Sequence, residues 1–468
     1  MTAPPDASRP FAPFAGERVL VVGLGRAGLP AALRLELWGA DVAVWDDGAE
    51  ARAAAEAQGL ALADPAAGVG RFRWDALLLS PGIPHRLPRA HPAAEAARAA
   101  GAPILCDVEW LFRAVRAAGS GARFVGITGT NGKSTTTALL HHLLRAAGRE
   151  SAAGGNLGPA ALSLDLLGDG GTYALEMSSY MLERTVSVRL DTAVMLNLSP
   201  DHLDRHGDMQ GYTAAKAAIF ARQGPDDLSV LGMDDEGARE MRGAVVGRFR
   251  PVSGMAPQPG GVWAENGTLR NDDGPILDLA GAPALPGSHN AQNAAAAAAC
   301  ALDLGLARAQ VAAGLASFPG LPHRQETVAE IGGVSFVNDS KATNADSAAR
   351  ALSSYGRVVW IAGGMAKEGG IEGLAPLFPR IARAFLIGRD APLLAGTLAA
   401  HGVPHEVAGT LEAAVPAAAA AARAGAAPVV LLSPACASWD QFTGFDQRGD
   451  RFRALVAAQL GPGRAAAA

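Results

Sequence analysis

The chain has 468 residues, which at about 100–200 residues per domain suggests two to four domains. Its 40 lysines and arginines nearly balance 45 acidic residues, the formal net charge is −5, and 49% of the residues are hydrophobic. This composition excludes a disordered polymer, gives no basic surplus for a nucleic-acid partner, and contains no uninterrupted apolar run of the roughly 18 residues that a membrane span requires.

Short apolar runs alternate with Ala- and Leu-rich helical stretches along the chain. Because many of the runs are near-continuous in Val, Leu and Ile, they predict parallel strands covered on both faces. The predicted strands are 18–23, 41–46, 75–80, 123–128, 172–176, 191–198, 357–362, 383–388 and 428–433, and alanine runs predict helices at 294–299 and 417–422. Linker-like segments at 119–121 and 318–322 divide this α/β chain into predicted domains 1–119, 120–320 and 321–468.

Lysine is rare in this chain. Only four of the 40 basic residues are lysines, namely Lys133, Lys216, Lys341 and Lys367. Arginine is used wherever a generic positive charge is sufficient, whereas lysine offers a compact point charge and an amine that can lose its proton. The four lysines are therefore candidates for functional positions.

A glycine-rich turn, Gly23-Leu24-Gly25-Arg26-Ala27-Gly28, follows the first predicted strand. It fits the pattern of a strand-to-helix turn that binds a diphosphate, and Asp46 ends the next strand, where a ribose-binding acid would lie. Alone, this pattern favours NAD, but the same turn fits any diphosphate at a helix N-terminus. A second loop, Ser80-Pro81-Gly82-Ile83, closes another strand and is expected to border the same crevice.

A second glycine-rich turn, 126–135, has the order of a phosphate-binding P-loop after a strand. Gly126 stands one residue too early for the strict pattern, so the motif is a variant. Backbone N–H groups would surround phosphates, Lys133 would reach the β/γ oxygens, and Ser134 would hold Mg²⁺. The predicted ATP-binding residues of this turn are Gly129, Thr130, Asn131, Gly132, Lys133, Ser134 and Thr135.

Acidic and histidine residues follow the next two apolar strands. Glu176 ends the strand at 172–176, where it fits a Mg²⁺ ligand and equally an ordinary strand-end acid. The segment 197–206 concentrates Asp and His, which indicates either metal or phosphate chemistry or a capped helix with solvated charges. Lys216 comes soon after it.

Further polar loops close or follow strands, the usual place for binding sites in open parallel sheets. Individually they are weak signals. They are 287–293, 322–326, 338–344, 363–367 and 432–442, and they include Lys341 and Lys367.

In this order, the motifs resemble those of the Mur ligases, the ATP-dependent amino-acid ligases of peptidoglycan precursor synthesis. The resemblance runs from Arg18 to Phe452, and the motifs at 338–344 and 433–442 resemble the branch that adds D-glutamate. It implies three α/β domains: a Rossmann-like N-terminal domain that binds the UDP part of a muramoyl substrate, a P-loop-type central domain for ATP, and a Rossmann-like C-terminal domain for the amino acid. The first glycine turn would then hold a uridine diphosphate in place of NAD.

The resemblance also implies an activity and its residues. ATP would phosphorylate a carboxylate of UDP-N-acetylmuramoyl-L-alanine, and the amine of D-glutamate would displace phosphate from that acyl phosphate. Lys133, Lys216 and His202 would be catalytic, and Mg²⁺ would be bound by Ser134, Glu176, His202 and Lys216, the last as a CO₂-derived carbamate.

The same resemblance assigns the binding residues. His289, Asn290, Asn293, Arg324 and Asp339 match positions on the ATP side. Gly23, Leu24, Gly25, Arg26, Asp46, Ser80, Pro81, Gly82 and Asn156 would bind the UDP substrate, and Thr343, Lys367, Ser438 and Phe445 would form the glutamate pocket. Met181 stands where this branch usually has Gln, which calls one hydrogen bond to the sugar-side substrate into question.

Alternatives remain open on the sequence. A ligase for another amino acid or a folylpolyglutamate synthase would share the chemistry, although the motifs of the third unit disfavour both. An NAD-dependent dehydrogenase would leave the P-loop and the lysines unused, and a non-catalytic nucleotide-binding regulator would not require Lys216 or His202.

The expected setting follows from the cysteines and the N-terminal segment. The three cysteines are far apart, which favours a reducing environment without disulfides or a zinc site. The N-terminal segment lacks the pattern of a secretory signal. We therefore expect a cytoplasmic protein. We also predict a monomer that binds neither membrane nor nucleic acid.

Overall fold

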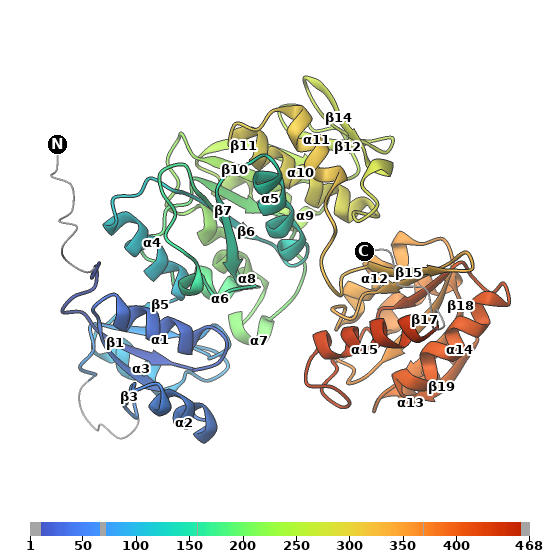
Figure 1. Cartoon of the computed structure of the whole chain (residues 1–468), viewed down its shortest axis with the longest axis horizontal. Helices are drawn as coiled ribbons and strands as arrows, with labels where there is room; N and C mark the ends of the chain where they lie inside the picture. Colours follow the sequence, from blue (N-terminus) through green and yellow to red (C-terminus); the bar gives the residue numbers. More distant parts are fainter. Residues whose placement is uncertain (1–10, 66–71, 157, 368, 460–468) are drawn as a thin grey trace. The chain divides into compact units, whose positions relative to one another are not determined.

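Figure 1 shows the computed structural model of the chain, which describes residues 11–65, 72–156, 158–367 and 369–459. The described residues form three sheets. The chain divides into two compact units, of which the first comprises Met1–Gly281 and Ala291–Ala316 and the second Ala282–Asn290 and Ser317–Ala468. The first unit contains two of the sheets and the second unit contains the third. The boundaries 119/120 and 320/321 stay predictions.

The first sheet is parallel throughout, with strand order β3-β2-β1-β4-β5. Alternate residues of β1 enter different cores, because Val19 and Val21 pack into one apolar cluster while Leu20 and Val22 pack into another. The order reverses between β1 and β4, which opens a crevice at the carboxyl ends of these strands. The elements are β1 (Arg18–Val22), α1 (Gly28–Leu37), β2 (Asp41–Trp45), α2 (Ala49–Ala57), β3 (Ala61–Leu62), β4 (Ala76–Leu79), α3 (Pro92–Ala99), β5 (Ile104–Leu105) and α4 (Asp107–Ala117).

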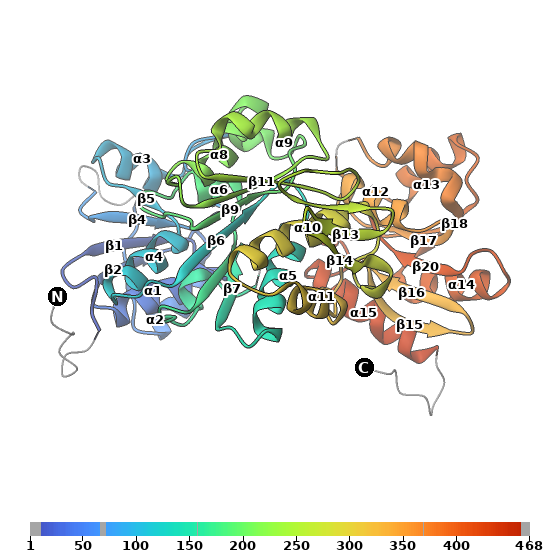
Figure 2. The same ribbon diagram turned by 90° about the horizontal axis from the view of Figure 1, so that it is seen from above.

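The second sheet has the order β14-β13-β12-β11-β10-β9-β6-β8-β7 and is parallel from β7 to β12. Its first elements are β6 (Arg123–Thr128), α5 (Lys133–Ala146), β7 (Ser151–Gly155), β8 (Thr172–Glu176), α6 (Ser179–Leu182), β9 (Thr192–Met195), α7 (Leu203–His206) and α8 (Met209–Ala217). The later ones are β10 (Leu228–Gly232), α9 (Glu236–Glu240), β11 (Arg248–Ser253), β12 (Val262–Glu265), β13 (Thr268–Asn271), β14 (Gly274–Asp278), α10 (Ser288–Asp303) and α11 (Arg308–Ala316). Helices α5 and α11 lie side by side in both views (Figure 2), with Gly314 packed against Leu143.

The end of the second sheet corrects the expectation of purely parallel sheets, because β12, β13 and β14 pair antiparallel. The cause is local. Asn266 and Gly267 separate β12 from β13 with φ angles of 50° and 78°, the left-handed backbone of a two-residue hairpin turn.

The third sheet has the order β15-β16-β20-β17-β18-β19, with β15 antiparallel to β16 and the other pairs parallel. Both faces are covered, since Trp360 and Ala362 pack into one apolar cluster and Val359 and Ile361 into another. The elements are β15 (Glu326–Ile331), β16 (Val334–Asn338), α12 (Ala345–Ser354), β17 (Val358–Gly363), β18 (Ile381–Ile387), α13 (Ala391–Ala400), β19 (His405–Gly409), α14 (Leu411–Arg423), β20 (Val429–Leu432) and α15 (Phe445–Ala458).

Every strand predicted from an apolar run is present, with its ends shifted by a few residues at most, and both alanine runs lie within helices, α10 and α14. The strands β3, β5, β7, β10, β11 and β19 and the hairpins β12–β14 and β15–β16 were not predicted. The described helices include none that is both long and apolar enough to cross a membrane. All three cysteines are buried free thiols.

Candidate active site

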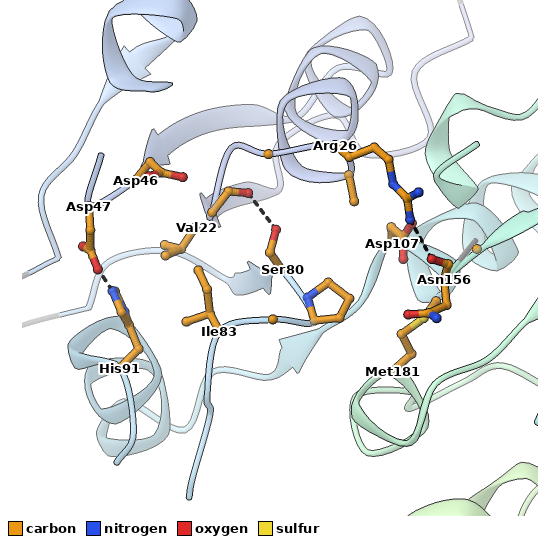
Figure 3. Close-up of a pocket in the computed structure, with 16 residues that line it drawn as sticks. Val22, Arg26, Asp46, Asp47, Ser80, Ile83, His91, Asp107, Asn156 and Met181 are labelled. Carbon is orange, nitrogen blue, oxygen red and sulfur yellow. Dashed lines mark hydrogen bonds and ion pairs between the residues drawn. The ribbon is translucent and has the colours of Figure 1, made fainter. Parts of the chain in front are cut away.

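A pocket of about 490 Å³ lies at the carboxyl ends of β1 and β4 in the first unit (Figure 3). Eight of the nine residues predicted to bind the UDP substrate line it: Gly23, Gly25, Arg26, Asp46, Ser80, Pro81, Gly82 and Asn156. Of the other lining residues, Ala27 and Ile83 belong to the two predicted loops but were not assigned to the site, and Met181 was given only as a departure from the family pattern. Sequence reasoning missed Val22, Asp47, His91, Asp107 and Gly155.

Leu24 is the predicted residue that does not line the pocket. Its side chain is buried in the apolar core, and its backbone N–H donates to Asp46 Oδ2 at 2.7 Å. The other oxygen of Asp46 accepts from Gly48 N–H at 2.8 Å. Asp46 therefore holds the glycine turn through Oδ2 and its own following loop through Oδ1.

Close backbone approach explains Gly28 of this turn. A Cβ at Gly28 would lie 1.8 Å from the carbonyl oxygen of Gly23, and Ser80 Oγ donates to that same oxygen at 2.7 Å. The N-cap of α1 is Ala27, which has no polar side chain to cap the first amides of the helix. Pro30 has no N–H, and the N–H groups of Leu29 and Ala31 donate to Gly25 O and Ala27 O at 3.4 and 3.1 Å. The amides that can receive a diphosphate are therefore those of the turn residues that line the pocket, Gly25, Arg26 and Ala27.

The far side of the pocket comes from the second sheet. Arg26 Nη2 donates to the backbone oxygen of Asn156 at 2.6 Å, as Figure 3 shows. Asn156 Nδ2 in turn donates to Glu176 Oε1 at 2.8 Å. The pocket is thus linked to the residue that ends β8.

The P-loop variant connects β6 to α5. Gly129 and Gly132 have φ angles of 150° and 84°, which only glycine adopts without strain. Lys133 Nζ donates to the carbonyl oxygens of Gly129 and Thr130 at 2.9 and 2.8 Å, so its charge lies against the loop. The backbone of Asn131 exchanges two hydrogen bonds, 2.8 and 3.0 Å long, with the side chain of Asn197.

Glu176 is the strongest cation-binding candidate in the first unit. Its side chain is 2% exposed, and Oε2 is buried without a hydrogen-bond partner among the residues that the structure describes. A buried carboxylate oxygen without a donor is costly, and a hard cation would satisfy it. The described residues contain no group of three or more His, Cys, Asp or Glu arranged around one metal position. A cation here would therefore also need ligands of another kind.

His202 and Lys216 differ sharply in burial. His202 has a left-handed backbone (φ 54°), and its Nε2 lies 3.4 Å from Asp201 Oδ2. Lys216 is 2% exposed, and its Nζ donates to Gly129 O at 2.8 Å and Thr128 Oγ1 at 3.4 Å, both neutral acceptors. Burial, reinforced by the charge of Lys133, holds the pKa of the Lys216 amine well below its usual value. The protein thus favours the neutral amine.

The polar loops of the second unit lie at the carboxyl ends of adjacent strands β16, β20 and β17. Met365 and Ala437 exchange backbone hydrogen bonds of 2.8 and 2.9 Å, which brings the loops of Lys367 and Ser438 together. Ser340 Oγ donates to the backbone oxygen of Phe445 at 2.7 Å, and this joins the loop of Thr343 to α15. The predicted glutamate-pocket residues therefore gather at one edge of the sheet.

Asp339 is held at the same edge. Its Oδ2 accepts from Ser433 Oγ at 2.7 Å and its Oδ1 from Gln325 N–H at 3.2 Å. Burial raises the pKa of this carboxyl to about 7. Gln325 Nε2 also lies 3.2 Å from His289 Nε2, and burial lowers the pKa of that histidine to about 4, so the ring is neutral.

The predicted ATP-side residues are divided between the units. Asn293 belongs to the first unit, where its Oδ1 accepts from Thr136 Oγ1 at 3.3 Å beside the P-loop. Asn290, Arg324 and Asp339 belong to the second unit, where Asn290 Nδ2 donates to Pro286 O at 2.9 Å. Their joint role in binding ATP stays a prediction.

Family models match two stretches of the chain: the Mur ligase middle domain matches residues 127–301, and the Mur ligase glutamate ligase domain matches residues 323–436. A curated UDP-N-acetylmuramoylalanine–D-glutamate ligase from Caulobacter vibrioides is 48% identical, over 98% of this chain and 100% of its own length. The chain belongs to the Mur ligase family.

Solved structures share the fold of this Mur ligase. The UDP-N-acetylmuramate–alanine ligase of Thermotoga maritima superposes with a TM-score of 0.58, at 18% identity, over 95% of this chain and 99% of its own. A MurF ligase from the same organism, solved in complex with ADP, gives 0.56 at 17% identity over 95% and 96%. The expected three-domain α/β architecture is confirmed by these relatives and by the three sheets.

Proposed function

We propose that this Mur ligase joins D-glutamate to UDP-N-acetylmuramoyl-L-alanine and converts ATP to ADP and phosphate. The observation that carries the proposal is the 48% identity, over nearly the full length of both chains, to a ligase named for this reaction. The loops of Lys341 and Lys367 support it, since they follow the carboxyl ends of β16 and β17, where open parallel sheets bind ligands.

The proposed reaction brings anions together twice. The substrate carboxylate attacks the γ-phosphorus of ATP, which expels ADP and forms an acyl phosphate. The amine of D-glutamate then attacks the acyl carbon, loses a proton and expels phosphate. Both steps need positive charge held in place before reaction. Lys133 supplies it at the P-loop, from the position where it now bonds two carbonyls of that loop.

Mg²⁺, when bound, would neutralise the charge of the triphosphate and of the attacking carboxylate. We assign it to Ser134, Glu176, His202 and Lys216, the last as a carbamate. The buried unpartnered oxygen of Glu176 supports this set. The low pKa of Lys216 supports the carbamate, because only a neutral amine captures CO₂.

The binding sites are assigned by the same proposal. The pocket at β1 and β4 takes the UDP substrate through the amides of the glycine turn and through Ser80, Gly82 and Asn156. Asn290, Asn293, Arg324 and Asp339 take ATP together with the P-loop, and Thr343, Lys367, Ser438 and Phe445 take D-glutamate.

We also propose that the protein works in the cytoplasm as a monomer with domains 1–119, 120–320 and 321–468. The buried free cysteines suit a reducing compartment. Analytical ultracentrifugation checks the oligomeric state, and limited proteolysis at 119–121 and 318–322 checks the boundaries.

Phosphate release tests the function. The purified chain receives ATP, Mg²⁺ and UDP-N-acetylmuramoyl-L-alanine, together with D-glutamate, L-glutamate, D-alanine or diaminopimelate in separate reactions. Only D-glutamate should give stoichiometric phosphate and a new UDP-linked product in mass spectrometry. Turnover with another of these amino acids would reassign the substrate, and phosphate release without a ligated product would make the chain a nucleotidase.

A further inference from the structure

Two arginines hold the 79–83 loop, which runs from Leu79 to Ile83 after β4, by its backbone carbonyls. Arg184 Nη1 donates to Leu79 O at 2.8 Å and to Ser80 O at 3.1 Å, and its Nη2 donates to Ile83 O at 2.7 Å. Arg205 donates to the two oxygens between them, to Gly82 O at 3.0 Å and to Pro81 O at 3.4 Å. Five consecutive carbonyls thus accept hydrogen bonds from guanidinium groups.

Both arginines lie in segments that connect strands of the second sheet. Arg184 follows α6, is 1% exposed, and anchors the loop from within the core. Arg205 lies in α7, whose N-cap is His202, and its guanidinium stacks 4.2 Å above the ring of Tyr180. Arg205 therefore joins the UDP-pocket loop directly to the helix that carries the proposed metal ligand.

Holding a carbonyl also orients the next amide. In a planar trans peptide, the N–H of Gly82 points opposite to the C=O of Pro81. Pro81 has no N–H, and Ile83 N–H closes a turn to Ser80 O at 3.0 Å. The Gly82 N–H has no acceptor among the described residues, and Gly82 lines the pocket. The arginine that bonds Pro81 O thus fixes where this remaining donor points.

We infer that Arg205 is a positioning residue for capture of the UDP-linked substrate: it sets the amide of Gly82 at the pocket and ties the 79–83 loop to the helix that begins after His202. The inference rests on the proposed function for the identity of that substrate. Arg205 itself does not line the pocket, so it acts through the loop.

The test compares Arg205→Ala and Arg205→Lys with the unaltered protein. Calorimetry measures the Kd for UDP-N-acetylmuramoyl-L-alanine, and kinetics measure KM for each substrate. Loss of two hydrogen bonds from a charged donor should raise Kd and KM for the UDP substrate about tenfold or more. KM for D-glutamate should not change, and the lysine variant should be intermediate because an ammonium cannot present the same planar fork.

Arg116 provides the matched control. It also donates to two backbone oxygens, those of Ser120 and Ala122 at 2.8 and 2.9 Å, and lies 4.9 Å above an aromatic ring, that of Phe112. Arg116→Ala should leave both constants for the UDP substrate unchanged. If Arg116→Ala raised Kd and KM for the UDP substrate equally, or if Arg205→Ala raised KM for D-glutamate in parallel, Arg205 would be a general stabilising residue and not a positioning residue.

Hydrogen exchange separates this inference from the proposed function. Without ligand, Arg205→Ala should speed amide exchange in the 79–83 loop, whatever the substrate is. If exchange and UDP-substrate binding both match the unaltered protein, the positioning role is wrong while the ligase assignment stands. If the unaltered protein does not bind the UDP substrate, the proposed function is wrong, and faster exchange in the variant still shows that Arg205 holds the loop.

Discussion

Burial distinguishes Lys216 from the other lysines of the chain. It is 2% exposed, its hydrogen bonds among the described residues go to neutral acceptors, and burial holds the pKa of its amine well below the usual value. A carbamate formed there would have the charge and the oxygen atoms of a carboxylate, which suits Mg²⁺. An ammonium at this position would repel the metal.

Chemical rescue separates these two states. Lys216→Ala should be nearly inactive, and acetate or propionate should restore part of its phosphate release because they replace the missing oxygen ligands. Lys216→Arg serves as the control, since it keeps a positive charge and cannot take up CO₂. Rescue by methylamine in place of acetate would show that the lysine acts as a cation.

Lys367 is the exposed counterpart, on the loop that follows β17. A small dicarboxylate needs a charged hydrogen-bond donor, so Lys367→Ala should raise KM for D-glutamate by about tenfold or more while KM for ATP changes little. Arg383→Ala is the matched control, since it removes an exposed cation of the same unit that pairs with Glu406 at 3.1 Å. Equal changes in both KM values would place Lys367 outside the glutamate pocket.

At the scale of the element, Gly132 is the position of the P-loop where a side chain would be most costly. A Cβ at Gly132 would lie 2.3 Å from Asn293 Oδ1, at a φ of 84° that costs an L-residue about 1–2 kcal/mol. Gly132→Ala should therefore lower the free energy of unfolding by about that amount or more and raise KM for ATP. Gly170→Ala, in open space and without a left-handed backbone, should leave both unchanged. Equal denaturation midpoints for the two variants would contradict this account of the turn.

Nine strands could be predicted from sequence because their apolar runs are buried on both faces of parallel sheets. The missed strand β10 is equally buried, but Ser229 and Gly232 interrupt its apolar run. The hairpin of β12 and β13 could have been found, since Asn266-Gly267 is a strong two-residue turn signal between alternating residues. The sequence could not show that Leu24, unlike its neighbours in the turn, does not line the pocket. A motif identifies the residues of a turn but not which of their side chains enter the core. Arg184 and Arg205 were equally hidden, since their acceptors lie more than a hundred residues away.

At the scale of the whole molecule, the pocket at the first sheet distinguishes a UDP-linked substrate from NAD. The glycine turn alone favours NAD, but Asp46 already accepts two backbone N–H groups and Asn156 of the second sheet borders the same pocket. Calorimetry should therefore show binding of UDP-N-acetylmuramoyl-L-alanine and none of NADH. If the protein bound NADH with a micromolar Kd and did not bind the UDP substrate, the dehydrogenase alternative would be favoured.

Because lysine is scarce, this enzyme has few side-chain amines that can be acylated. Amine-directed acylating reagents find only four side-chain targets, of which Lys216 is shielded by the core. Lys133, Lys341 and Lys367 remain: Lys133 begins α5 directly after the P-loop turn, and Lys341 and Lys367 lie in loops that follow β16 and β17. Peptide mass mapping of the acylated protein would thus report on occupancy of its substrate loops, without any engineered label.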